Sequence, residues 1–328
     1  MLGRSPETEV LRLLYASAYE AEGFRPFLAS LAGLTHARGA VLRIEAAGTH
    51  RFETGLAADL PPPEVLRRMR RERVYAQDEL DHPAPIRLLR AGTRAEAQAW
   101  LALVHPLRAF RAADGAQLDR LAPHLGPAVE SWLALGQERA RARQSAATGA
   151  SLGAGWLWLD AGGRLVEADA AARALLGPQA PAGRLELDDP LAARALRGAL
   201  DRAVTGAGPP EVLTLRRQPR LQLALLPGLA APAPGLEPVL RGLLRAEPLA
   251  AHLDAAALSA SLDLSRSETR LAVLLCDGHS LAEAAARLGW TPETARSCSK
   301  RIFARTGTRG QSDLIRRLLT GADWLAQV

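Results

Sequence analysis

The strongest structural constraint in the sequence is a series of helix start and stop signals near its C-terminal end. A capping box, in which two side chains each accept a hydrogen bond from the other's backbone N–H, occurs twice. A Thr-Pro pair marks a third helix start, and glycines mark the ends of the first two helices. These signals are Ser265 with Glu268, Gly278, Ser280 with Glu283, Gly289, and Thr291 with Pro292. They predict an all-α domain over 262–328, with a fourth helix at about 311–319.

The third of these helices has two chemically different faces. At about 100° per residue, its small and apolar side chains gather on one side and its charged side chains on the other. The first side has Ala295, Ser299, Ile302 and Thr306, and the second has Arg296, Ser297, Lys300 and Arg301. We expect the first face to pack on the preceding helix and the second to be a cationic, hydrogen-bonding surface. A tight Gly-Trp-Thr turn before this helix makes the pattern typical of a helix-turn-helix.

The same segment resembles the LuxR/NarL-type DNA-binding domain. The resemblance rests on Leu264, Glu268, Leu274, Gly278, the EAAARLG run at 283–289, Thr294 and the RIFARTGTRGQSDLIRRLL run at 301–319. It implies a double-stranded DNA partner. By this resemblance Arg296, Ser297 and Lys300 face base edges, whereas Thr294 and Arg301 contact phosphates. Ala284 and Ala295 stand where larger aliphatic residues are usual, and Cys298 and Ser299 are also unusual at their positions.

Two alternatives to DNA binding also fit these helices. A charged helix face is usually only a solvated surface, so the segment could be a small helical bundle without a nucleic-acid partner. The helices could also belong to a sigma factor, but no upstream segment resembles a promoter-melting domain. The agreement of the caps, the glycine stops and the opposed faces favours DNA binding.

After a polar, small-residue segment at 137–150, the sequence pattern changes from helical to strand-like. A strand at 155–160, a turn, a strand at 164–167 and a helix at 169–176 precede strand-like runs at 211–216, 221–226 and 239–244. The run GWLWLDAGGRLVEADAAARALLG resembles the opening of a PAS domain, with Asp169 in place of the usual asparagine. Asp169 can still cap the helix.

Trp156 and Trp158 alternate with Leu157 and Leu159, so both indoles face one side of the first strand. They could line a ligand pocket or simply fill the core, and we weigh the core more heavily. No Cys or His occurs between 151 and 250, which excludes a flavin–cysteine photosensor and a His-ligated haem from this domain. An organic effector, or no cofactor, remains.

Residues 1–136 give weaker signals. The helix expected at 114–135 resembles the final helix of GAF-like sensor domains, and its apolar stripe Leu118–Trp132 could pair two subunits or pack on its own sheet. His105 and His124 lack paired spacing, so we interpret them as structural. The arginines at 67–73 are interpreted as a solvated helix face.

Several enzyme classes are excluded by residue counts and motif context. Lys300 is the only lysine, so a P-loop NTPase, a protein kinase and a pyridoxal phosphate enzyme all lack the lysine they need. Cys276 and Cys298 cannot build a disulfide framework or a four-cysteine metal site, and we expect no metal. The GASLG run at 149–153 fits the motif of serine hydrolases, but a polar linker precedes it where a strand is required. We therefore expect no enzyme activity.

Membrane insertion is also not expected. The most apolar stretch, 221–236, has no charge, but prolines interrupt it and it is shorter than the roughly 20 residues that a spanning helix needs. The N-terminus lacks the apolar core of a signal peptide. The expectation is a soluble, cytoplasmic protein with no membrane partner.

A chain of 328 residues with 48% apolar and 23% charged residues is long enough for two or three globular domains. We expect α+β sensor domains, GAF-like over 1–136 and PAS-like over 151–250, followed by the all-α, four-helix LuxR-type domain. Residues 137–150 would form a helical connector and 251–261 a linker.

This organisation leaves three functional hypotheses. The first is a one-component transcriptional regulator that binds DNA as a homodimer, responds to a small molecule upstream and, if an activator, contacts RNA polymerase. In the second, the upstream domains are protein–protein adaptors without a ligand. The third, a ligand-modifying enzyme with a DNA-binding tail, has no nucleophile–base pair to support it.

Overall fold

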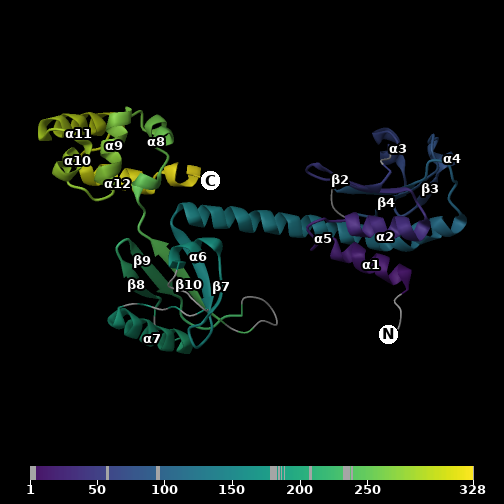
Figure 1. The fold of residues 1–328 in the computed structure, drawn as a ribbon, viewed down its shortest axis with the longest axis horizontal. Coiled ribbons are helices and arrows are strands. Elements are labelled where there is room, and N and C mark those ends of the chain that lie inside the picture. The colour runs from purple at the N-terminus through teal and green to yellow at the C-terminus, as the bar shows by residue number, and fades with distance from the viewer. Residues whose placement is uncertain are drawn as a thin grey trace. The chain divides into compact units, whose positions relative to one another are not determined.

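A computed structural model describes residues 5–56, 59–93, 97–177, 183, 185, 187, 189–206, 209–231, 237 and 239–327. The chain is mixed α+β, with two antiparallel five-stranded sheets and a helical C-terminal region (Figure 1). It divides into two compact units, Met1–Arg141 and Ala142–Val328. Within the described ranges, every helix is too short or too polar to cross a membrane.

The first unit is a sheet with helices on both faces. Its strand order is β2-β1-β5-β4-β3, and all neighbouring strands are antiparallel. The strands are β1 (Gly39–Glu45), β2 (Thr49–Gly55), β3 (Val74–Ala76), β4 (Ile86–Arg90) and β5 (Gln98–Val104). Helices α1 (Pro6–Ala16), α2 (Arg25–Thr35) and the first half of α5 (Ala112–Ser151) cover one face. On the other face lie α3 (Pro63–Arg68) and α4 (Gln77–Leu80).

Helix α5 packs its apolar stripe on the sheet of its own unit. Leu118 and Leu125 are completely buried, and Leu121 and Val129 join them in the same core cluster. The stripe, for which pairing of two subunits was the alternative, therefore packs within its own unit. Gly126 lies so close to the residues after β4 that an added Cβ would stand 2.4 Å from the carbonyl oxygen of Gly92. The segment 137–150 continues the helix to Ser151 as an exposed, polar connector.

The second sheet has the order β7-β6-β10-β9-β8 and is also antiparallel throughout. Its strands are β6 (Ala154–Leu159), β7 (Leu165–Ala168), β8 (Glu211–Arg217), β9 (Arg220–Leu225) and β10 (Leu240–Ala246). Asp169 caps α6 (Ala170–Leu176), and its Oδ1 accepts from Ala172 N at 2.7 Å. The second helix, α7 (Pro190–Thr205), has no bounds in the sequence prediction, which expects only short helices between the hairpin and the later strands, although Asp189 and Pro190 are ordinary start signals. Pro232 and Pro234, expected to interrupt the apolar stretch, lie outside the described residues.

The C-terminal helices are α8 (Ala255–Ser261), α9 (Arg266–Cys276), α10 (Leu281–Leu288), α11 (Pro292–Thr306) and α12 (Gln311–Thr320). Both predicted capping boxes form, and Thr291 caps α11 as predicted. The segment 251–261, expected as a linker, contains the short helix α8. Asp254 caps α8, and Leu258 is buried in the same core as α9. The preceding turn is held by Asp277, whose carboxylate accepts from the N–H groups of Ala250 and Ala251.

The structure also locates the histidines, the arginine cluster and the serine that the sequence analysis considers. His124 Nδ1 lies 2.9 Å from the Tyr15 hydroxyl, and His105 Nδ1 accepts from two backbone N–H groups of its own turn, which fits the structural interpretation. The arginines at 67–73 are exposed, but α3 ends at Arg68, so they do not form one helix face. Ser151 ends a helix and precedes a strand, which is the reverse of the order required around a hydrolase nucleophile.

The tight contact at Gly126 generates the first prediction. Gly126→Ala forces a methyl group against the Gly92 carbonyl, and we expect a loss of about 1–3 kcal/mol of stability through overpacking. Gly136→Ala lies in the same helix with open space around its Cβ position, so it should be neutral or slightly stabilising. Urea denaturation of both full-length variants measures the difference. Equal midpoints would contradict the close approach.

Candidate nucleic-acid interface

Helix α11 is held in a fixed orientation by a cap at its start and a buried face along its length. Thr291 Oγ1 accepts a hydrogen bond from Thr294 N at 3.2 Å, and Pro292 occupies the first turn. Ala295 and Ile302 are completely buried, and Cys298 retains 2% exposure. Cys298 and Ile302 pack in one core with residues of α9, α10 and α12. The helix therefore has only its opposite face available to solvent.

That available face has all five predicted DNA-contacting residues. Each of them is exposed, namely Thr294, Arg296, Ser297, Lys300 and Arg301. Arg296 forms a surface ion pair with Glu293 at 3.5 Å, a contact that is weak in water and easily exchanged for another anion. Thr294 shares a hydroxyl–hydroxyl contact of 2.9 Å with Thr291. The five residues that the sequence analysis selects therefore lie together on the exposed face of α11.

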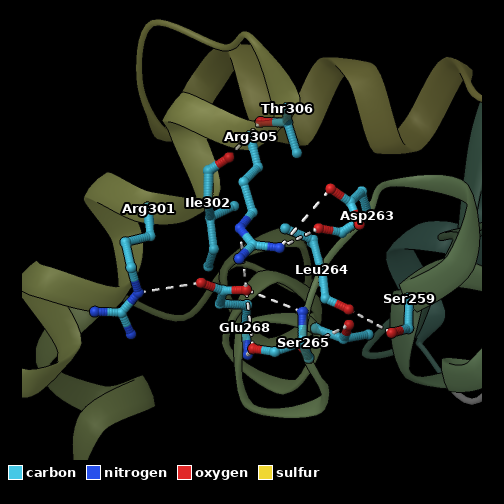
Figure 2. A network of polar contacts seen from close by, with 10 residues as sticks. Ser259, Asp263, Leu264, Ser265, Glu268, Arg301, Ile302, Arg305 and Thr306 are labelled. Carbon is cyan, nitrogen blue, oxygen red and sulfur yellow. Dashed lines mark hydrogen bonds and ion pairs between the residues drawn. The ribbon is translucent and has the colours of Figure 1, made fainter.

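Arg301 and Arg305 are anchored by a buried carboxylate that the predicted site does not include. Glu268 lies in the first turn of α9, and its side chain is 3% exposed. Its Oε1 accepts from Arg301 Nε at 3.1 Å, and its Oε2 accepts from Ser265 N at 2.9 Å and Ser265 Oγ at 2.8 Å. Arg305 Nε lies 3.8 Å from Oε2, and Arg305 also donates to the Asp263 carbonyl at 2.9 Å. Figure 2 shows these side chains converging from α11 and α9 on Glu268.

The electrostatics of Glu268 favour its charged form. Burial opposes ionisation, but the hydrogen bonds from Ser265 and the contacts with Arg301 and Arg305 outweigh it and lower the pKa of Glu268 below that of an ordinary glutamate. Arg301 keeps 60% of its side chain exposed, and its terminal nitrogens point away from Glu268 (Figure 2). The guanidinium is therefore fixed at one edge and open to an external anion at the other.

Sequence reasoning gives Glu268 only its capping role. A capping-box glutamate uses one oxygen for the N-cap N–H, and a second oxygen that is buried must find another donor. Arg301 supplies that donor from 33 positions away, and Arg305 adds an ion pair from 37 positions away, so no local spacing indicates either residue. The two-faced pattern of α11 does not predict the contact between Arg301 and Glu268 either, because in that pattern Arg301 lies on the solvent-facing side.

The predicted ligand residues lie on the solvent-facing side of the central sheet. Leu157 and Leu159 are completely buried, whereas Trp156 and Trp158 alternate with them and are half-buried. The two indole rings contact each other at a centroid distance of 4.9 Å. They therefore face one way, as predicted, but the buried leucine cluster with α6 and α7 lies on the other face. Trp156 and Trp158 are therefore not part of this core, and they do not line a pocket within it.

A hollow suited to a small molecule occurs instead in the first unit. It has a volume of about 890 Å³ and lies between the β1–β2 turn and the middle of α5. Trp132 forms one wall, with His50 at a ring-centroid distance of 5.0 Å, and Gly136 leaves the helix side open. Volumes of about 300–1,000 Å³ are typical of small-molecule sites.

Comparisons with known proteins give limited results. No protein-family model matches the chain, and no curated protein matches it. Among solved structures, it is similar to the Vibrio cholerae VqmA dimer without target DNA, a LuxR-type receptor, at 16% identity over 52% of this chain and 83% of that chain, with a TM-score of 0.23. The VqmA–ligand–DNA complex of the same organism matches at 17% identity over 50% and 80%, with a TM-score of 0.25. The E. coli DhaR(N)–DhaL complex matches at 14% identity over 73% and 87%, with a TM-score of 0.31.

The Glu268 network generates the second prediction. Glu268→Gln keeps the shape but removes the charge that faces two arginines, so we expect a loss of about 1–3 kcal/mol at neutral pH. Because the folded-state pKa is lowered, the wild-type contribution is fully present above the unfolded pKa and is lost as pH falls through the folded pKa. Thermal unfolding at a series of pH values should therefore show a shallower acid limb in the variant.

Asp263→Asn is the matched control for this measurement. Asp263 is the other acidic neighbour of Arg305, at 3.8 Å, but its side chain is 96% exposed. Asn tolerates the positive φ of 51° at this position. This variant should change stability very little at any pH. An equal effect of the two substitutions would contradict the role assigned to Glu268.

Proposed function

We propose that the chain is a sequence-specific DNA-binding regulator of transcription, in which residues 262–328 bind double-stranded DNA through α11. The observation that carries the proposal is the two-faced character of α11. Its apolar face is buried in a capped helical domain, and Thr294, Arg296, Ser297, Lys300 and Arg301 are exposed together on the other face. The resemblance of this segment to LuxR/NarL-type domains agrees with the same residues.

The exposed face has the chemistry that duplex recognition requires. The major groove admits one α-helix, and an arginine can donate two hydrogen bonds to a guanine edge. Arg296, Ser297 and Lys300 are proposed to face base edges. Arg301, fixed by Glu268 with its terminal nitrogens open, is proposed to bind a phosphate, as is Thr294. Neutralising phosphates releases counterions, so binding should weaken steeply with salt.

The full regulator is proposed to act as a homodimer in the cytoplasm on two half-sites about one helical turn apart. An activator of this kind would also contact RNA polymerase. Control by a small organic effector is part of the proposal, with no haem, flavin or metal involved. The hollow beside Trp132 replaces Trp156 and Trp158 as its candidate site, because it combines an aromatic wall with a suitable volume.

The third prediction tests the DNA interface. Replacing both Arg296 and Lys300 with alanine should abolish specific binding in a gel-shift assay, because direct base contacts and charge are lost together. Both side chains are exposed, so the circular dichroism spectrum and the unfolding midpoint should stay unchanged. Arg296→Lys separates the two effects. It keeps the charge but loses the paired donors, so it should lower specificity by about tenfold or more while retaining non-specific binding.

Unchanged affinity of the double variant for its operator would overturn the assignment of α11 as the recognition helix. Loss of specific and non-specific binding in equal measure by Arg296→Lys would instead mean that Arg296 contacts a phosphate rather than a base.

The fourth prediction tests the effector site. Gly136→Leu fills the hollow beside Trp132 without touching the core, because its Cβ position is open. Native mass spectrometry of the full chain from its own host should show a bound small molecule on the wild type and none on this variant. Gly33→Leu, another open helix position, is the control that should retain the molecule. A wild type without bound molecule would favour the adaptor alternative.

A further inference from the structure

The turn after α3 has four arginines that are separate from the proposed DNA-binding helix. Arg67 and Arg68 end α3, Arg70 and Arg71 follow it, and all four side chains are exposed. These four residues are called the arginine patch below. The chain leaves the helix at Met69, whose backbone is extended. The four charges therefore lie around a turn rather than along one helix face.

The backbone of this turn is fixed to the sheet beneath it. Arg90 of β4 donates through Nη1 to the carbonyl oxygens of Arg67 at 2.8 Å and Met69 at 2.7 Å. Trp100 Nε1 of β5 donates to the Leu66 carbonyl at 3.1 Å. Because the carbonyl groups at the end of α3 already have these donors, the exposed arginine side chains are not required as helix caps.

The acidic residues near the patch do not neutralise it. Glu64 precedes the two helical arginines by three and four positions, a spacing that suits ion pairs, and the carboxylate of Glu72 lies over Gly92. Neither glutamate forms an ion pair with any arginine that the structure describes. By contrast Arg73, which follows the patch closely, pairs with Glu79.

The patch also repels a buried neighbour. Arg71 Nη1 donates to the Thr93 carbonyl at 3.0 Å, and its positive charge acts on Arg90. Burial and, after it, the charge of Arg71 lower the pKa of Arg90 from the usual value of an arginine. An anion bound beside Arg71 would relieve this repulsion.

The chemistry of the patch suits a phosphate polymer better than a protein. No large apolar side chain of residues 62–73 is exposed, because Leu66 and Met69 are buried. A protein interface has a desolvated core of apolar and aromatic side chains, with charges mainly at its rim. The phosphates of a nucleic acid are bound through charge alone, and a guanidinium can donate two hydrogen bonds to one phosphate.

The size of the patch allows several phosphates to face it together. The backbone from Arg67 to Arg71 can extend over at most about 14 Å. Duplex DNA has one negative charge per about 1.7 Å of its axis, which is twice the charge density of one of its strands. A duplex therefore offers this turn the greater electrostatic gain.

We propose that the arginine patch binds the phosphate backbone of double-stranded DNA independently of sequence, as a second DNA contact besides α11. The contact goes beyond the proposed function, because it reads no bases and does not require α11 to be a recognition helix. It also requires no fixed arrangement of the two units.

The experiment measures how salt weakens the binding of the full-length protein to a fluorescently labelled duplex of random sequence. Arg67→Gln, Arg68→Gln and Arg70→Gln are combined in one variant. Their side chains form no hydrogen bond or ion pair with the part of the chain that the structure describes, so circular dichroism should stay unchanged. Each lost phosphate contact reduces the slope of log K against log salt by about 0.9, so the slope should become flatter by about 2–3. At low salt the affinity should fall by about tenfold or more.

The matched control removes the same charge elsewhere. Arg194→Gln, Arg197→Gln and Arg217→Gln, at exposed positions of α7 and β8, should leave the slope close to that of the wild type. The three patch substitutions are also added to the variant with Arg296→Ala and Lys300→Ala. Because the two contacts are separate, the combined variant should bind the duplex more weakly than either parent.

An unchanged slope in the patch variant would overturn the inference and turn the search toward an acidic protein partner. An equal flattening in the control would overturn it too, because net charge rather than the patch would then be the cause. The proposed function fails separately, since it depends on the loss of operator binding by the α11 variant and not on the patch.

Discussion

The candidate DNA interface depends on one buried carboxylate. Glu268 belongs to α9, which packs against α11, and it accepts a hydrogen bond from the N–H of the N-cap residue Ser265 while it contacts Arg301 and Arg305 of α11. A buried charge is tolerated only when it is fully hydrogen-bonded and paired, and here both carboxylate oxygens have donors. The cap of α9, the packing of α9 against α11 and the orientation of Arg301 thus share one side chain.

The sequence predicts those parts of the structure that local chemistry determines. Capping boxes, the Thr-Pro start of α11 and the opposed faces of that helix all follow from spacing alone, and the structure has each of them. The five candidate contact residues of α11 accordingly lie on one exposed face. The strands of the central sheet are predictable for the same reason, because Leu and Trp alternate along β6 and turn residues bound it.

Other features depend on tertiary contacts that local spacing does not contain. The segment expected as a linker is ordered as α8, because Leu258 reaches the core of α9 and Asp277 holds the turn before it. The contact between Glu268 and Arg301 spans 33 positions. Alternation places Trp156 and Trp158 on one face, but which face is covered depends on α7, a helix whose position the sequence analysis does not give. Once α6 and α7 cover the leucine side, the indoles are left on the side that faces solvent.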